Sequence, residues 1–232
     1  MLKPKAVLAW SGGKDSAMAL WRMMQENKFE LAGLLTTISL PYERISMHGV
    51  RRSLLEAQAA SIGLPLFTAE VSQKTNDEYE TAMLAAFQKL KTQGISHIVF
   101  GDIFLEDLRL YREELLARAG LEGVFPLWKE ETAALAELFI REKFRTITCC
   151  VNDAKLDAGW CGKEFDDRFL DELPGGVDPC GENGEFHTFC FDGPVFKSPV
   201  VFEKGEIVYR PLELKAADYT TETKGFWYCD LF

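Results

Sequence analysis

The chain has 232 residues, of which 47% are hydrophobic and 27% charged, a balance typical of a globular protein with a sizeable core. This composition excludes collagen-like, repeat and disordered chains, and the formal charge of −10 argues against non-specific binding to nucleic-acid phosphates. No apolar run approaches the roughly 20 residues of a membrane-spanning helix, and the N-terminus lacks a signal-peptide pattern, so we expect a cytoplasmic protein. Six cysteines, none in a C-x-x-C pair, predict reduced thiols rather than a zinc or redox site.

The first part of the chain alternates β-rich apolar runs with helical patterns. Strands are predicted at 5–10, 31–38, 65–69 and 95–100, and helical patterns follow them at 17–24, 50–62, 79–90 and 106–119. Strand–helix–strand units form right-handed crossovers, which place consecutive strands in parallel. The pattern therefore predicts an α/β fold with a Rossmann-like parallel sheet and flanking helices.

The regular alternation of strand and helix patterns ends further along the chain. A helical pattern at 131–143 and a strand at 146–151 are followed by a glycine- and proline-rich stretch that leaves room for little helix beyond 165–173. Two apolar runs, 199–202 and 207–209, flank a short charged segment and predict a hairpin. We expect a smaller mixed α+β C-terminal domain, with its boundary within 125–145.

The strongest chemical signal is the sequence Ser-Gly-Gly-Lys-Asp-Ser at residues 11–16, between the first strand and the first helix. Glycine allows backbone conformations closed to other residues, so successive N–H groups can turn toward an anion at the positive end of the helix. Lys14 adds a positive charge. The spacing fits neither the Walker loop nor the dinucleotide motif. The alternative is a plain Gly-Gly turn with Asp15 or Ser16 as the helix N-cap.

This segment resembles the S-G-G-x-D-S signature of the PP-loop ATP pyrophosphatases, which cleave ATP between the α and β phosphates. Further segments narrow the resemblance to the diphthine–ammonia ligase family and its uncharacterised bacterial relatives, over nearly the whole chain. These segments are Gly101-Asp102-Ile103, Pro126-Leu127-Trp128, the stretch GENGEFHT at 181–188, and Asp192-Gly193-Pro194.

The resemblance implies an adenine nucleotide alpha hydrolase-like fold and an ATP-dependent ligase. A carboxylate of the acceptor would attack the α-phosphorus of ATP, and ammonia would then displace AMP to leave an amide. The departing pyrophosphate needs amides, a lysine and Mg²⁺ to stabilise its charge, so ATP and Mg²⁺ are the expected cofactors. The predicted ATP-binding residues are Ser11, Gly12, Gly13, Lys14, Asp15, Ser16, Thr36, His48, Gly101 and Asp102, with Lys14 also catalytic and Asp15 a candidate Mg²⁺ ligand.

Several of these residues have an ordinary structural alternative. Thr36 ends the second strand, at the sheet edge where α/β proteins bind ligands, but suits a plain strand residue equally well. His48 lies in the next loop, where the alternative is a solvated histidine. Asp102 suits Mg²⁺ or ribose, with a helix N-terminal acid as the alternative. Arg109 and Arg112 are interpreted as part of an exposed, salt-bridged helix face.

Glu182, Glu185 and His187 form a second cluster, which we predict to be catalytic. In a strand that starts at Glu185, alternation would place Glu185 and His187 on one face and Phe186 and Thr188 on the other. An acid and a histidine so placed can bind Mg²⁺, hold ammonium or relay a proton. An exposed Gly-rich turn is the alternative.

The chain departs from the family pattern at a few positions. The ligases usually carry Gly-Glu-Gly-Gly-Glu-Tyr-Glu-Thr, so Asn183 replaces a glycine and His187 replaces an acid. Asp107-Leu108-Arg109 stands where the family tends to have Tyr-Gln-Arg. We expect any difference in acceptor substrate from the ligases to arise from these positions.

Two other functions stay open. One is a PP-loop enzyme that modifies tRNA bases, against which the missing cysteine pairs and the net charge weigh. The other is a non-catalytic module that only binds adenine nucleotide. For the ligase, the expected partners are ATP, ammonium and, in an organism that makes diphthamide, elongation factor 2 carrying diphthine; a homo-oligomer is also considered. The predicted domains are 1–130, which binds ATP, and 131–232, which binds the acceptor.

Overall fold

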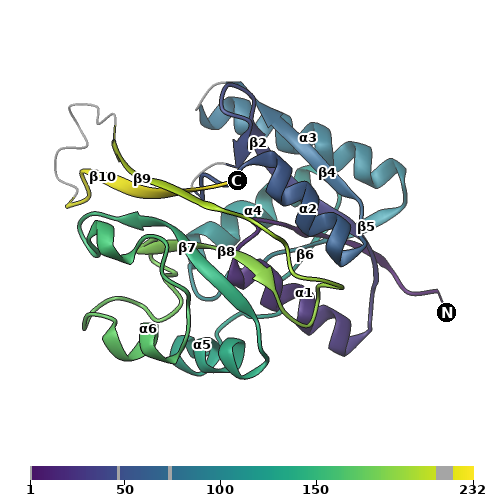
Figure 1. Ribbon diagram of the computed structural model, residues 1–232. Coiled ribbons are helices and arrows are strands. Elements are labelled where there is room, and N and C mark those ends of the chain that lie inside the picture. Colours follow the sequence, from purple (N-terminus) through teal and green to yellow (C-terminus); the bar gives the residue numbers. More distant parts are fainter. Residues whose placement is uncertain (1, 46–47, 73–74, 213–221) are drawn as a thin grey trace.

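The computed structural model describes residues 2–45, 48–72, 75–212 and 222–232 (Figure 1). The first part of the chain forms a six-stranded sheet that is parallel except for one short strand. β1 lies in the middle, between β2 and β5, and β6 extends the β5 side. β4 pairs with β2, and β3 pairs antiparallel with the end of β2. The strands are β1 (Lys5–Ala9), β2 (Glu30–Ser39), β3 (Arg44–Ile45), β4 (Leu66–Val71), β5 (Ile95–Val99) and β6 (Glu122–Val124).

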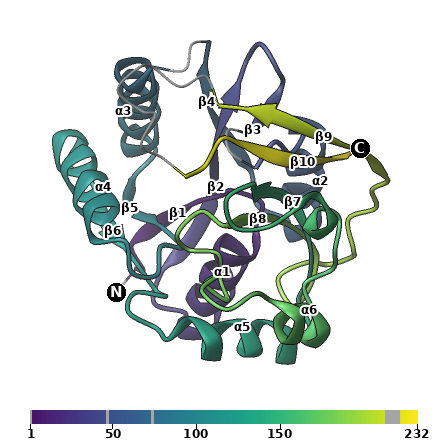
Figure 2. The same cartoon turned by 90° about the vertical axis from the view of Figure 1, so that its left-hand side faces the viewer.

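Helices cover both faces of this sheet. α1 (Lys14–Glu26) and α2 (Arg52–Ile62) share one hydrophobic core, whereas α3 (Asn76–Thr92) and α4 (Glu106–Ala119) share another on the opposite face (Figure 2). Ala6, Val7 and Leu8 are completely buried because β1 is covered on both faces, as the apolar runs of parallel strands require. The predicted Rossmann-like sheet with flanking helices is confirmed.

The later part of the chain forms a separate antiparallel sheet, in the order β8-β7-β10-β9. Its strands are β7 (Arg145–Asn152), β8 (Phe186–Asp192), β9 (Lys204–Pro211) and β10 (Gly225–Leu231). α5 (Thr132–Arg141), the 3-10 turn η1 (Ala158–Trp160) and α6 (Asp167–Glu172) accompany it. The mixed α+β character predicted for this part of the chain is confirmed.

The predicted hairpin of 199–202 with 207–209 is wrong. Residues 199–203 lie in no strand, and β9 begins at Lys204, inside the segment that we assigned to the turn. β9 pairs with β10 instead, with Val208 opposite Tyr228. The hydrogen-bonding partner of β9 thus lies outside the segment whose alternation we analysed. A local alternation pattern does not show which strand will pair with it.

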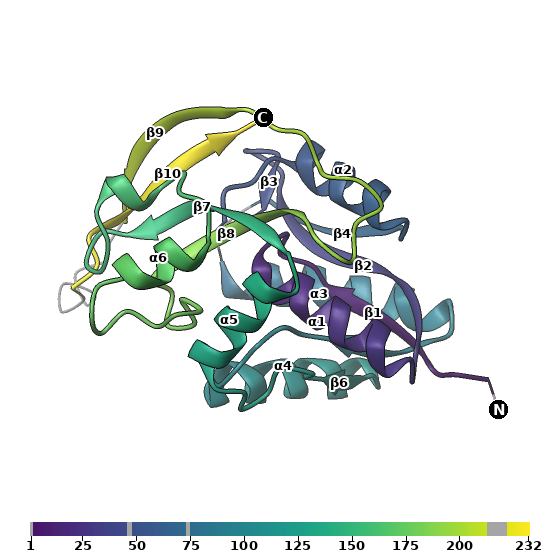
Figure 3. The same ribbon diagram turned by 60° about the horizontal axis from the view of Figure 1, so that its bottom comes forward.

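The two sheets meet through a shared hydrophobic core. One buried cluster contains Leu20 of α1, Leu55 of α2, Phe189 of β8 and Leu231 of β10. β8 lies against α1, so the second sheet reaches the helix that follows the predicted loop (Figure 3). Among the described residues, no helix combines the length and the apolar character needed to cross a membrane.

Candidate functional site: a glycine loop between two sheets

The segment at residues 11–16 forms the turn from β1 into α1. Gly12 has a φ of +78°, which favours glycine, and Gly13 is the helix N-cap without a capping side chain. Because α1 begins at Lys14, Asp15 and Ser16 lie within its first turn, and the alternative in which one of them is the N-cap is wrong. A Cβ atom on Gly13 would lie 2.9 Å from His48 Cε1 and 3.0 Å from the Thr188 carbonyl oxygen, so only glycine fits there.

The peptide between Gly12 and Gly13 is held from one side. The Gly12 carbonyl accepts hydrogen bonds from the Cys190 N–H at 2.8 Å and from Gln58 Nε2 at 2.9 Å. Since the carbonyl and the following N–H of a trans peptide point in opposite directions, these bonds direct the Gly13 N–H away from Gln58. That N–H donates to Ser11 Oγ at 3.2 Å. The next amide, of Lys14, donates to Thr188 Oγ1 at 3.0 Å.

Sequence reasoning missed Gln58 and the role of Thr188. Gln58 is completely buried, and besides the Gly12 carbonyl it binds the Trp10 indole N–H and the Cys190 carbonyl. It occupies the buried face of α2 with Leu54, Leu55 and Ala59. A polar residue at a core-facing helix position was the available signal, because such a side chain must find buried partners.

Lys14 is buried at the junction of the two sheets. Its ammonium group donates to Asp15 Oδ1 at 2.6 Å and to the Cys180 carbonyl, and it lies 5.6 Å from the centre of the Phe186 ring. Burial lowers the pKa of Lys14, but Asp15, Cys180 and Glu182 together outweigh it, and the pKa is raised overall. Lys14 is therefore a permanent cation beside the loop.

Glu182 connects the second part of the chain to the segment after β5. Its Oε1 atom accepts hydrogen bonds from the Ile103 N–H at 2.7 Å and from the Phe104 N–H at 3.3 Å. Burial raises the pKa of Glu182 to about 7, although the Ile103 N–H opposes the shift. This carboxyl group can exchange a proton near neutral pH.

Asp102 forms an ion pair with Arg112, with Nε 2.6 Å from Oδ2. Burial raises the pKa of Asp102, and Arg112 opposes the rise. The residue precedes α4 by several positions, so it is not the helix N-terminal acid of the alternative interpretation. The preceding Gly101 is in close contact with the loop, because a Cβ atom there would lie 2.9 Å from the Asp15 carbonyl.

His48 and His187 lie side by side, with ring centres 4.6 Å apart. His48 Nδ1 is 3.1 Å from the Thr188 carbonyl oxygen, so the nitrogen that faces it carries the proton. Burial lowers the pKa of both imidazoles, which are therefore neutral at pH 7. His48 is thus not the solvated loop histidine of the alternative. Phe186 and Thr188 share the face toward Lys14, as alternation predicted.

Glu185 lies just before β8 and is almost completely buried. Its Oε1 atom accepts from the Asp178 N–H and from Asn183 Nδ2, each at 3.1 Å, whereas the buried Oε2 atom has no partner among the described residues. The two departures from the family pattern thus each contact a predicted site residue: Asn183 binds Glu185, and the His187 ring packs at a tilt against His48.

Thr36 is the predicted ATP-binding residue that comes from the second strand. Thr36 is buried within β2, which continues to Ser39, so the prediction that Thr36 ends the second strand is wrong. Its hydroxyl has no partner in the described part of the chain. Within that same part, no group of three or more His, Cys, Asp or Glu side chains is arranged to hold a metal ion. All six cysteines are free and buried, as predicted.

A mainly parallel α/β sheet, with a Gly-Gly turn opening the helix after its first strand, is consistent with the PP-loop fold. Comparison with protein families makes this specific. The model of the diphthamide synthase N-terminal domain matches residues 4–123, and that of the diphthamide synthase C-terminal domain matches residues 131–214. The chain belongs to the diphthamide synthase family.

Curated relatives carry the same association. The chain is similar to the diphthine–ammonia ligase of Bos taurus, with 30% identity over 62% of this chain and 54% of that protein. It is similar to the Homo sapiens ligase, with 29% identity over 74% of this chain and 61% of that protein, and to the Danio rerio ligase, with 26% identity over 85% and 86%. The chain thus spans just over half the length of the bovine and human relatives that it matches.

Proposed function

We propose that the protein is an ATP-dependent ligase that converts a carboxylate of its acceptor into an amide. The acceptor carboxylate attacks the α-phosphorus of ATP, a new P–O bond forms, and the bond to pyrophosphate breaks. Ammonia then attacks the acyl carbon, and AMP leaves with the electrons of the cleaved C–O bond. The names of the bovine, human and zebrafish relatives support this reaction class.

The observation that carries the proposal is the fixed orientation of the Gly12–Gly13 peptide. The Gly13 and Lys14 amides bond only to hydroxyl oxygens, of Ser11 and Thr188, which an anion can replace without breaking a backbone ladder. These amides, the positive end of α1 and the Lys14 ammonium are suited to the charge of departing pyrophosphate. ATP would then bind at residues 11–16.

The second step requires a nucleophile and a proton acceptor. We assign the proton acceptor to Glu182, because its pKa of about 7 suits proton exchange at neutral pH. The unpartnered Oε2 of Glu185 would accept a hydrogen bond from ammonium, and the neutral His48 and His187 would orient the intermediate. Diphthine on elongation factor 2 is the proposed acceptor, and domains at 1–130 and 131–232 would bind ATP and acceptor respectively.

Magnesium would be held mainly by the nucleotide. Mg²⁺ in such sites typically takes one or two protein carboxylates together with phosphate oxygens and water. Asp15, in the first turn of α1, is the residue suited to it, since its side chain is one-third exposed and only its Oδ1 atom binds Lys14. The ion would supply charge neutralisation at the phosphates.

The test is product analysis with magnesium, ATP, ammonium and diphthine-bearing elongation factor 2. We expect AMP and pyrophosphate in equal amounts, and nitrogen from isotopically labelled ammonium in the acceptor. In Gly13→Ala, the added Cβ displaces His48 and Thr188, so ATP affinity should fall roughly tenfold or more.

Gly175→Ala is the matched control, because a Cβ atom at Gly175 meets nothing within 4 Å. This variant should bind ATP as the wild type does. ADP and phosphate as products would overturn the proposal, and so would unchanged ATP affinity in a folded Gly13→Ala protein.

A further inference from the structure

A ladder of arginine and aromatic side chains leads away from Asp102. The Arg112 guanidinium, which pairs with Asp102, stacks 4.5 Å from the centre of the Phe100 ring. Phe100 stacks on Phe125 with ring centres 5.5 Å apart. Arg109 then lies 4.6 Å from the centres of both the Phe125 and Trp128 rings. The ladder ends at Arg109 and Trp128.

Arg109 is held in place but keeps free donors. Its Nε donates to Glu113 Oε1 at 2.8 Å, one turn along α4, and the two rings fix the plane of the guanidinium. In the described part of the chain, nothing bonds to its two terminal nitrogens, and its side chain is 32% exposed. A rigid guanidinium with both outer N–H groups available matches the geometry of a carboxylate.

The Arg109 end of the ladder belongs to the same edge of the sheet as the glycine loop. The Lys129 N–H, adjacent to Trp128, donates to the Ile103 carbonyl at 2.7 Å. The Ile103 N–H in turn donates to Glu182. The segment that carries Trp128 and the segment that carries Glu182 therefore lie on either side of Ile103.

The charges around this edge show why a cation with unused hydrogen-bond donors matters. Asp15, Asp102 and Glu182 are acidic, and ATP would add several negative charges. Lys14 is already bound to Asp15 and the Cys180 carbonyl, and Arg112 is already bound to Asp102. An acceptor carboxylate would be repelled from such a site unless a further cation received it. Arg109 meets that requirement, because only its Nε is used in the ion pair with Glu113 and its two terminal nitrogens have no partner in the described part of the chain.

We propose that Arg109, together with the Trp128 indole N–H, binds the acceptor carboxylate that is to be activated; this rests on the proposed ligase function. The guanidinium holds one carboxylate oxygen while the other attacks the α-phosphorus. The indole N–H, which donates to no atom of the described residues, would supply a second donor next to the guanidinium, whose carbon lies 4.6 Å from the centre of the ring. The ligand class is therefore an aliphatic carboxylate.

This site also distinguishes the substrate from the product. Amide formation removes the negative charge, so the product loses its ionic interaction with Arg109 while its shape barely changes. Charge-assisted hydrogen bonds are about twice as strong as neutral ones. The guanidinium therefore favours carboxylate entry and amide release.

A binding experiment tests the proposal without depending on turnover. Protein labelled with fluorotryptophan is titrated with butyrate and with butyramide, its uncharged analogue, and the Trp128 fluorine resonance is assigned with Trp128→Phe. Butyrate should shift that resonance saturably, with a Kd of about 1 mM, and butyramide should not shift it. The shift should disappear in Arg109→Gln, weaken in Arg109→Lys, and persist in Arg118→Gln, whose arginine lies on the same helix and pairs with Glu80.

A kinetic experiment with diphthine-bearing elongation factor 2 complements it. In Arg109→Gln, KM for the acceptor should rise about ten- to hundredfold while KM for ATP changes less than about twofold. An equal butyrate response in Arg109→Gln, an equal response to butyramide, or no saturable response in the wild type would overturn the assignment. A wild type that forms no AMP would instead overturn the ligase function, and the fluorine titration would still decide the role of Arg109.

Discussion

Glu182, the proposed proton acceptor, also affects the stability of the folded chain. It bonds to the Ile103 and Phe104 amides across the junction of the two sheets, yet burial raises its pKa from its ordinary 4.5 to about 7. Between these two values, the folded protein binds more protons than the unfolded chain does. The contribution of Glu182 to the free energy of unfolding is therefore largest in mild acid and falls as the pH rises through 7.

We accordingly expect Glu182→Gln to gain stability relative to the wild type as the pH rises. Glutamine keeps an oxygen acceptor for both amides but never ionises, so it lacks the cost of burying a charge. Denaturant midpoints of both proteins at about pH 5 and about pH 8 measure the difference. Curves that run parallel over this range would contradict the assigned pKa.

At the scale of elements, Gln58 connects three separate segments of the chain to α2. Its side chain links α2 to the end of β1 through Trp10, to the glycine loop through Gly12, and to β8 through Cys190. Because the Gly12 carbonyl also accepts from the Cys190 amide, α2 and β8 both hold the same oxygen atom of the loop. The orientation of the Gly13 amide depends on this arrangement.

Gln58→Leu should damage both stability and nucleotide binding. The substitution leaves the Trp10 N–H and the Cys190 carbonyl oxygen without their Gln58 partner in the interior, at a cost of about 1–3 kcal/mol for each unsatisfied group. ATP affinity, measured by titration calorimetry, should fall with it. Gln88→Leu, at an exposed position of α3, should leave both quantities unchanged. Normal ATP affinity in a folded Gln58→Leu protein would show that the hydrogen bond from Gln58 to the Gly12 carbonyl is dispensable.

Local patterns predicted the elements whose signals lie within one segment. The helix at 106–119 has the predicted bounds, and the glycine loop falls between a buried strand and a helix as expected. The pairing of β9 with β10 was missed because it joins segments separated in the sequence. Arg109 does form the predicted salt bridge with Glu113, but Arg112 turns inward to Asp102, a choice set by tertiary packing.

The candidate site divides in the same way. The loop residues 11–16 were accessible from the sequence because their spacing is a motif with its own chemistry. Gln58 and Thr188 carry no motif, and they acquire their roles only when α2 and β8 close on the loop. Asp102 had a visible position at the sheet edge, but its pairing with Arg112 depends on a helix turn that no local pattern specifies.

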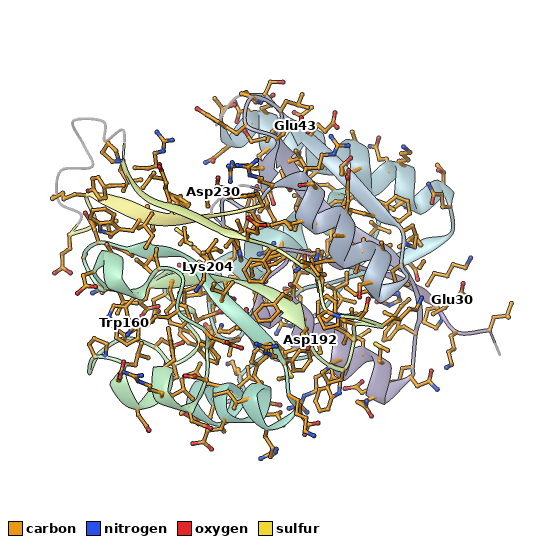
Figure 4. The ribbon with its side chains drawn as sticks, in the orientation of Figure 1. Glu30, Glu43, Trp160, Asp192, Lys204 and Asp230 are labelled. Carbon is orange, nitrogen blue, oxygen red and sulfur yellow. The ribbon has the colours of Figure 1, made fainter. Side chains whose placement is uncertain are left out.

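At the scale of the molecule, an ion-pair cluster joins the far end of the second sheet to the first. Asp230 in β10 binds Arg51 at 2.6 Å and Arg44 at 2.8 Å, and Figure 4 shows Asp230 on the side of β10 that faces the parallel sheet. The hydrogen bond from Arg51 lowers the pKa of Asp230 to about 2. The stabilisation is therefore present above its ordinary pKa and is lost as the pH falls toward 2.

Asp230→Asn should lower the stability of the whole chain by roughly 1 kcal/mol at neutral pH, a figure reduced for solvent screening of the pair. The denaturant midpoints of variant and wild type should converge in strong acid, where Asp230 is protonated in both states. Asp171→Asn, at an exposed position of α6, controls for the change in net charge alone. A difference that stays constant down to strong acid would contradict the ion-pair explanation.

The two hydrogen bonds to the Gly12 carbonyl make the loop depend on both parts of the chain. Its two donors are encoded some 46 and 178 positions downstream, one in each part of the gene. A fragment that ended before β8 would keep the signature motif but would lose the Cys190 donor. We therefore expect the Gly12–Gly13 peptide to keep its orientation only when both parts of the chain are present.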